Sequence, residues 1–123
     1  MNTKTCAILI QKRDATPLEA AAKVDEAIRS GCVCFLSGLE YGAGLDAAEA
    51  VLTQKSVHPS LTLECVIPYE EYPSAWEEPD RDRYFEIVRR CDRETMLHCA
   101  YVPDWKQRQR EYLLQHADIA IVI

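Results

Sequence analysis

Hydrophobic residues recur along this chain in two alternating patterns. Five short apolar runs, rich in residues that favour strands, occupy residues 5–10, 32–36, 61–68, 94–99 and 117–123. Between them lie four segments with apolar residues at helical spacing, for which we expect helices. Short buried strands that alternate with helices are typical of a parallel, doubly wound α/β sheet. The pattern therefore predicts five parallel strands with helices on both faces.

The clearest helix boundaries surround the first helix. Thr16 can cap it, Pro17 suits its first position, and Glu19 completes a capping box, while Ser30-Gly31 is a typical helix end. The second helix is expected after Gly44 as far as residue 55, and the third from Pro79. Two further sequence features predict the fourth helix: Asp104 as its cap and Gln107 as the partner in a second capping box.

The expected strand order is 3-2-1-4-5. In open α/β sheets, ligands bind beyond the carboxyl ends of the strands, where the order reverses. This order places the crevice between the first and fourth strands. Basic side chains would flank it, namely Lys12, Arg13, Lys106 and Arg108.

The composition and charge of the chain reduce the number of functions that it could have. The chain has 123 residues and a formal net charge of −6 at pH 7, so we expect one domain over 1–123 without tight binding to nucleic acid, which depends on clustered Lys and Arg. Its apolar runs are too short for a membrane span or a signal peptide. Six cysteines without a Cys-x-x-Cys pair and three scattered histidines indicate reduced thiols of a cytoplasmic protein and no metal site.

The glycine-rich turn after the second strand is the strongest candidate for a site. Ser37-Gly38 ends the strand, and Gly42 and Gly44 open the helix that follows. A strand, a glycine turn and a helix direct free backbone N–H groups at an anion. The alternative is that these glycines only permit a positive φ or close packing.

Acidic and aromatic side chains follow the same predicted edge of the sheet. Asp46 and Glu49 fall in the first turns of the second helix and could accept hydrogen bonds from ribose hydroxyls, or simply suit the helix dipole. After the third strand comes an aromatic, acidic loop with Glu70 and Trp76. A base could stack on such rings, although aromatics also cap cores.

Together these motifs resemble the SLOG superfamily, named for the DNA-processing protein A (Smf) and Lonely Guy families. The closest likeness is to its YpsA-like branch of uncharacterised bacterial proteins. The resemblance rests on Ser37-Gly38-x-x-x-Gly42-x-Gly44-x-Asp46, on Ile67-Pro68 followed by acids and Trp76, and on Gln107-Arg108 with Tyr112.

The resemblance implies a Rossmann-like three-layer sandwich that binds or senses a nucleotide or nucleotide-derived ligand, with no further cofactor. By position, the residues that frame the ligand would be Ser37, Gly38, Gly42, Gly44 and Asp46. Those that flank it would be Glu70, Trp76 and Arg108.

Two departures keep other functions open. The branch usually has Thr-Gly-His-Arg after the first strand, where this chain has residues 10–13, Ile-Gln-Lys-Arg, and the Pro-Gly-Gly-x-Gly-Thr motif of Lonely Guy enzymes is absent. The alternatives are a hydrolase of an N-glycosidic bond that uses Asp46 or Glu49, a DNA-associated protein, and a degenerate scaffold without a ligand. A homodimer would cover a sheet edge at residues 119–123.

Overall fold

A computed structural model describes residues 3–12 and 14–123. It contains four helices and five strands in alternation. The strands are β1 (Lys4–Leu9), β2 (Cys32–Ser37), β3 (Thr62–Ile67), β4 (Arg93–Met96) and β5 (Ile119–Val122). The helices are α1 (Pro17–Arg29), α2 (Ala43–Lys55), α3 (Glu78–Arg90) and α4 (Trp105–Gln115). The α/β class predicted from the alternating pattern is confirmed.

All the strands pair in parallel, in the order β4-β3-β2-β1-β5. The predicted order 3-2-1-4-5 is therefore wrong in one respect: β4 lies at the edge beside β3, and β5 takes the place beside β1 that was expected for β4. Consequently the order of the strands reverses between β1 and β5.

The sequence of β4 explains its place at the edge. Its residues Arg93 and Glu94 are exposed, whereas the last four residues of β1, which lies between β2 and β5, are all buried. A strand between two others needs apolar residues on both faces, which β4 lacks. At the start of β4 the backbone N–H of Asp92 donates to Leu63 O at 2.9 Å, and its carboxylate accepts the N–H of Leu63 at 2.9 Å, so this residue aligns β4 with β3.

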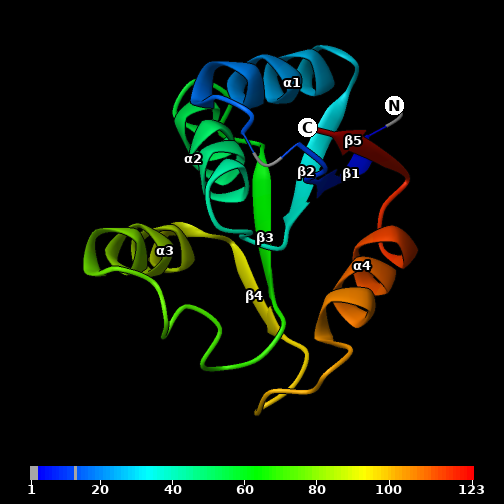
Figure 1. Ribbon diagram of the computed structural model, residues 1–123. Coiled ribbons are helices and arrows are strands. Elements are labelled where there is room, and N and C mark those ends of the chain that lie inside the picture. Colours follow the sequence, from blue (N-terminus) through cyan, green and yellow to red (C-terminus); the bar gives the residue numbers. More distant parts are fainter. Residues whose placement is uncertain (1–2, 13) are drawn as a thin grey trace.

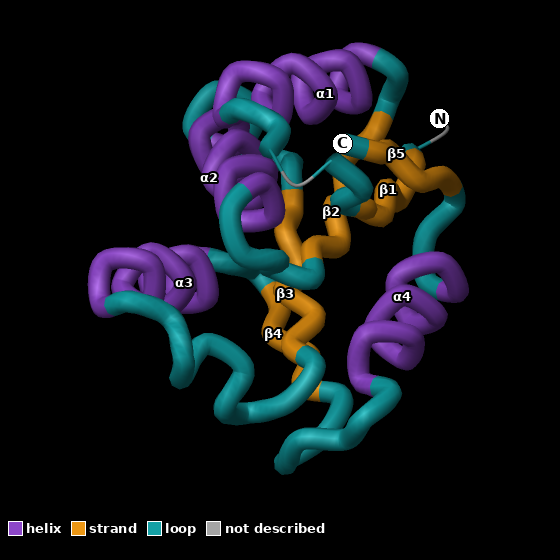
Figure 2. Tube along the Cα trace, in the orientation of Figure 1, coloured by secondary structure: helices purple, strands orange, loops and turns teal. Residues whose placement is uncertain are grey.

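Three helices cover one face of the sheet and one helix covers the other (Figures 1 and 2). The larger core cluster joins α1, α2 and α3 to one side of β1, β2 and β3, with Val24, Leu45 and Ile87 among its members. The smaller cluster joins Leu113 of α4 to the other side of the same strands. The result is the three-layer sandwich that the family resemblance implied.

The ends of the helices test the predicted caps. Thr16 and Glu19 form the full capping box of α1, and Ser30 is its C-cap. The second predicted box is wrong: Asp104 is the N-cap of α4 but makes no side-chain capping bond. Its carboxylate instead accepts a hydrogen bond from Nε of Arg108 at 2.8 Å.

The cysteines also differ from expectation. Cys6 of β1 and Cys32 of β2 form a disulfide, so the prediction that all thiols are reduced is wrong for this pair, while Cys34, Cys65, Cys91 and Cys99 are free. The two bonded residues lie on neighbouring strands, Cys6 within β1 and Cys32 at the start of β2, and both are fully buried. Separately, no helix within the described ranges combines the length and the apolar character needed to cross a membrane.

Candidate functional site

The turn between β2 and α2 has an unusual backbone. The hydroxyl of Ser37 accepts the backbone N–H of Leu39 at 3.1 Å, and Leu39 takes a positive φ of 53°. Gly42 has φ 83° and ψ −109°, which suits glycine alone, and it is the N-cap of α2 without a side-chain capping bond. The positive end of the α2 dipole is thus left without a side chain of the cap residue to cover it.

Two other glycines of the turn are required by close packing. A Cβ atom on Gly38 would lie 2.4 Å from Oε1 of Glu40, and one on Gly44 would lie 2.9 Å from Cβ of Glu40. Both distances are shorter than side chains tolerate, so the Glu40 side chain occupies the space that these glycines leave free. This geometry gives Gly38 and Gly44 a packing role whether or not a ligand binds there.

Glu40 is the main feature of the site that the sequence did not reveal. Its Oε1 atom is buried and has no hydrogen-bonding partner among the residues that the structure describes. Burial raises the pKa of Glu40 from 4.5 to about 7, although a bond to its own backbone N–H and the positive charge of Lys106 act in the opposite direction. Buried polar atoms are normally satisfied, so an unpaired carboxylate oxygen here needs an explanation.

Helix α4 lies against the turn through Gln109. This side chain is only 4% exposed, and its amide donates to the carbonyls of Gly38 at 3.0 Å and of Val66 at 2.9 Å. One side chain of α4 therefore holds the ends of both β2 and β3. Gln109 was also missed by the sequence reasoning, because its partners lie far away in the sequence.

Glu40 borders a small cavity, of about 60 Å³, between the ends of the strands and α4. The remaining lining residues are Leu9, Ile10, Lys106, Gln109, Arg110 and Leu113. Lys106 and Arg110 are four positions apart and therefore share one side of α4. The cavity thus combines one partly buried acid, whose Oε1 atom is inaccessible to solvent, with two basic side chains at the carboxyl edge of the sheet.

Arg108 lies on a different side of α4 from this cavity. It pairs with Asp104 and borders a separate hollow with His98 and Gln115. The structure does not bring Arg108 together with the glycine turn. The predicted role of Arg108 in flanking a ligand stays a prediction.

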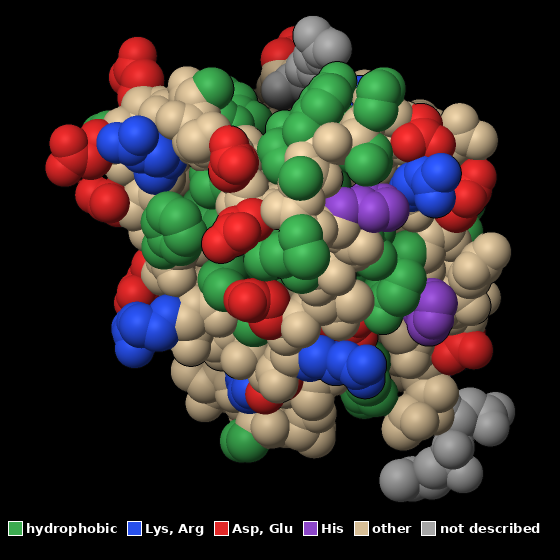
Figure 3. Space-filling model, turned by 90° about the horizontal axis from the view of Figure 1, so that it is seen from below, with side chains coloured by type: hydrophobic (Ala, Val, Ile, Leu, Met, Phe, Trp, Pro, Cys, Tyr) green, Lys and Arg blue, Asp and Glu red, His purple; other side chains and the backbone are tan. Residues whose placement is uncertain are grey.

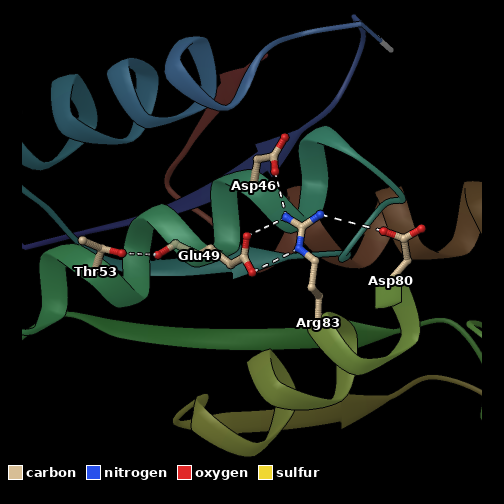
Figure 4. A network of polar contacts seen from close by, with 5 residues as sticks. All are labelled: Asp46, Glu49, Thr53, Asp80 and Arg83. Carbon is tan, nitrogen blue, oxygen red and sulfur yellow. Dashed lines mark hydrogen bonds and ion pairs between the residues drawn. The ribbon is translucent and has the colours of Figure 1, made fainter. Parts of the chain in front are cut away.

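Asp46 and Glu49 share a single partner, Arg83 of α3 (Figure 4). The guanidinium donates to Asp46 at 2.8 Å and to both oxygens of Glu49, at 2.5 and 3.2 Å. The hydrogen bond to Glu49 raises the pKa of Arg83 most, and the bond to Asp46 raises it further, whereas partial burial lowers it. Asp80 stands 4.0 Å from the same group. Both predicted acids are therefore part of a charge network that joins α2 to α3.

The aromatic residues form one connected cluster beside the turn. Trp76 contacts Tyr41 of the turn and Tyr72 in edge-to-face geometry, both at 5.3 Å between ring centres, and Tyr84 of α3 at 5.6 Å. The rings of Trp76 and Tyr72 pack against the larger core cluster. Glu70 lies exposed in the same loop.

The loop after β1 contributes little charge to the site. Lys12 pairs with Glu19 of the α1 capping box at 3.1 Å, and Arg13 lies outside the described residues. The backbone N–H groups of Gln11 and Lys12 both donate to the carbonyl of Ile123, at 2.7 and 2.9 Å. The expected crevice beside the carboxyl end of β1 is thus bridged at this point by backbone hydrogen bonds.

Figure 3 looks from below in the view of Figure 1, onto the ends toward which β2, β3 and β4 run. Acidic and hydrophobic side chains are interspersed near the middle of this face, and the basic side chains stand in small groups around them. Within the described ranges, no group of three or more His, Cys, Asp or Glu residues could hold a metal ion. The chemistry of this edge is therefore that of hydrogen bonds, paired charges and aromatic rings.

Comparison with known proteins gives a family. The model of the YspA SLOG family matches residues 18–123. A UPF0398 protein of Halalkalibacterium halodurans is 32% identical over 98 residues, which are 78% of this chain and 52% of that protein. A UPF0398 protein of Staphylococcus aureus strain JH9 is 22% identical over 103 residues, 82% of this chain and 55% of that protein. The chain spans about half the length of the curated relatives it matches, and it belongs to the YspA SLOG family.

Proposed function

We propose that this chain binds a nucleotide or a nucleotide-derived small molecule at the carboxyl edge of its sheet, beside the N-terminus of α2. The observation that carries the proposal is the buried Glu40 carboxyl group, with one oxygen unpaired among the described residues, next to a helix that has no side-chain cap. A ligand can supply both missing partners, because it can donate a hydrogen bond to the carboxyl group and place an anionic group at the helix end.

The surroundings suit such a ligand. Lys106 and Arg110 line the same cavity as Glu40 and would attract a phosphate group. The aromatic cluster around Trp76 reaches the turn through Tyr41, whose side chain is 57% exposed. A nucleobase could stack on such a ring. The cavity of about 60 Å³ would hold only one group of the ligand, so the remainder would lie on the surface.

A thermal-shift screen tests the proposal. The purified chain is mixed separately with AMP, ADP, ATP, NAD, ADP-ribose, cyclic dinucleotides and inorganic phosphate. A compound that binds only the folded state adds about 2.7 kcal/mol of stability at a hundredfold excess over its dissociation constant. We expect a rise in Tm with at least one nucleotide. No rise with any of them would favour a scaffold that has kept the fold without the ligand.

Two arginines of α4 make a matched pair of variants. Arg110 lines the cavity with Glu40, and Arg108, two residues earlier, borders a different hollow. We expect Arg110→Gln to weaken binding of the compound found in the screen by about tenfold, the usual effect of losing one charge-assisted contact, and Arg108→Gln to leave it unchanged. The reverse result would support Arg108 as the residue that flanks the ligand.

Hydrolysis of the same ligand is the second candidate. It is favoured by the pKa of Glu40, which burial raises to about 7, since a group with a pKa near the working pH can both accept and donate a proton. Asp46 and Glu49 remain candidates for this role, although both hold Arg83. Chromatography of the bound nucleotide after incubation separates the two functions: release of the free base would indicate turnover.

A further inference from the structure

We propose that Glu40 couples ligand binding to proton uptake: its carboxyl group takes up a proton when an anionic group of the ligand reaches the N-terminus of α2. This inference rests on the proposed function, and it adds the chemical class that the site selects, an anion such as a phosphate ester. It also makes Glu40 the residue through which pH controls affinity.

The geometry places the carboxyl group where it meets such an anion. Oε1 of Glu40 lies 2.4 Å from the position of a Cβ on Gly38, and its Cβ and Cδ atoms lie 2.9 and 3.6 Å from the position of a Cβ on Gly44, in the first turn of α2. The side chain therefore stands against both ends of the turn that leads into the helix. An anion drawn to the same helix end would therefore approach the Glu40 carboxyl group, which can be either ionised or protonated.

Two negative charges at one helix end would repel each other. The usual outcome for two acidic groups in contact is that one of them holds a proton. Oε1 has no partner among the described residues, so a proton on Glu40 is free to be donated to an incoming anion. The contact would then be one hydrogen bond between an acid and an anion, without an uncompensated charge.

The groups that face Glu40 support this assignment. From α4 come the positive charges of Lys106 and Arg110, and from the loop after β1 comes the uncharged Ile10. From the loop after β3 comes the phenol of Tyr72, which interacts with Glu40 electrostatically. None of the three histidines lines this cavity. Without a ligand, these positive charges favour the ionised form of Glu40. A bound anion would neutralise them, and the carboxyl group would then take up a proton.

Because Glu40 is partly buried, its carboxyl group gains or loses a proton near neutral pH. The pKa of Glu40 is raised to about 7, so the unliganded protein holds this carboxyl group partly protonated at neutral pH. An anion that binds only the protonated form would lose affinity as pH rises. Between about pH 6 and about pH 8 the loss would be about tenfold.

The experiment measures ADP-ribose binding by calorimetry at both pH values, with the wild-type chain, Glu40→Gln and Glu71→Gln. ADP-ribose is chosen because its two phosphate groups keep the same charge over this range. The wild type and Glu71→Gln, a variant of an exposed acid in a neighbouring loop, should bind about tenfold more weakly at pH 8. Glu40→Gln should bind equally well at both, since Gln keeps a donor and carries no charge.

A second measurement needs no variant. Calorimetry of the wild type at about pH 8 in two buffers with different enthalpies of ionisation gives the number of protons taken up per ligand, and we expect about one. Binding without proton uptake, or an equal pH dependence in Glu40→Gln, would overturn the inference and leave the proposed function standing. If none of the screened nucleotides bound at either pH, the proposed function would fall and the coupling with it.

Discussion

Carboxyl groups near the start of α2 have two different kinds of surroundings: Asp46 and Glu49 lie within the helix, and Glu40 lies in the turn that precedes it. Asp46 and Glu49 point to α3 and share the guanidinium of Arg83. Glu40 points to α4 and has one oxygen that is buried without a partner among the described residues. The paired acids are held by charge, whereas the unpaired one is held by packing against two glycines.

The difference shows how weakly a residue type alone indicates its role. Both sets are acids near the start of one helix, a place that suits negative charge. Their roles separate only when α3 and α4 are placed, because α3 brings a guanidinium that bonds directly to Asp46 and Glu49, whereas the cations of α4 line the cavity beside Glu40 and leave its Oε1 atom unpaired among the described residues. Three substitutions examine this contrast, in order of decreasing effect on stability.

The largest effect is expected for Gly38→Ala. The new methyl group would lie 2.4 Å from Oε1 of Glu40 and 2.7 Å from Nε2 of Gln109, so both side chains must move. We expect a loss of about 3 kcal/mol in the free energy of unfolding, the upper part of the range for overpacking. Urea denaturation measures it. A loss close to zero would show that the Glu40 side chain is not held in this position.

Glu40→Gln should have an effect of similar size and of the opposite sign. The pKa of Glu40 is raised in the folded protein from 4.5 to about 7. Between these two pH values the folded state therefore binds more protons than the unfolded state. Wild-type stability therefore falls as pH rises through the window, and the loss is complete above about 7. Near pH 8 the variant should be more stable than the wild type by about 3 kcal/mol.

The measurement for Glu40→Gln is the free energy of unfolding in urea at several pH values. The advantage of the variant should shrink as pH falls from about 7 and vanish below 4.5, where the wild-type carboxyl group is protonated in both states. An advantage that stays the same at every pH would assign the effect to packing and not to the proton.

The smallest of the three is Arg83→Ala. It removes the cation from Asp46 and Glu49, which are then left close together, but the arginine side chain is 36% exposed and solvent screens the charges. We expect a loss of about 1 kcal/mol. Arg89→Ala, in the same helix, is the matched control, because among the described residues Arg89 pairs only with Glu86, on the surface. Equal effects of the two changes would contradict a structural role for the Arg83 network.

Sequence reasoning succeeded where the cause is local. The Thr16 cap, the Ser30 end and the glycine turn are each decided by residues a few positions apart, and the structure contains them all. The alternating apolar pattern likewise predicts the class of the fold. Family resemblance extended this correctly to the YspA SLOG family.

Sequence reasoning failed where a feature depends on residues that are far apart in the sequence. The order of the strands depends on the side of the sheet to which β4 returns, and the short, polar β4 carries only a weak signal of its place at the edge. Glu40 was overlooked because nothing nearby in the sequence shows that one oxygen of its carboxyl group is buried. Its burial follows from α4, whose Gln109 bonds to Gly38 across 71 positions. No local spacing rule reaches that far.

The position of β5 has a consequence for how the sheet is assembled. β1, β2, β3 and β4 pair in sequence order, each with the next and with one helix between them, but β5 returns to β1 and places Ile119 opposite Cys6. During synthesis β1 therefore remains an open edge until residues 119–122 have been made. Contacts of such long range form late in folding. The edge strand β5, which covers this side of β1, should thus be the last to acquire protection from hydrogen exchange.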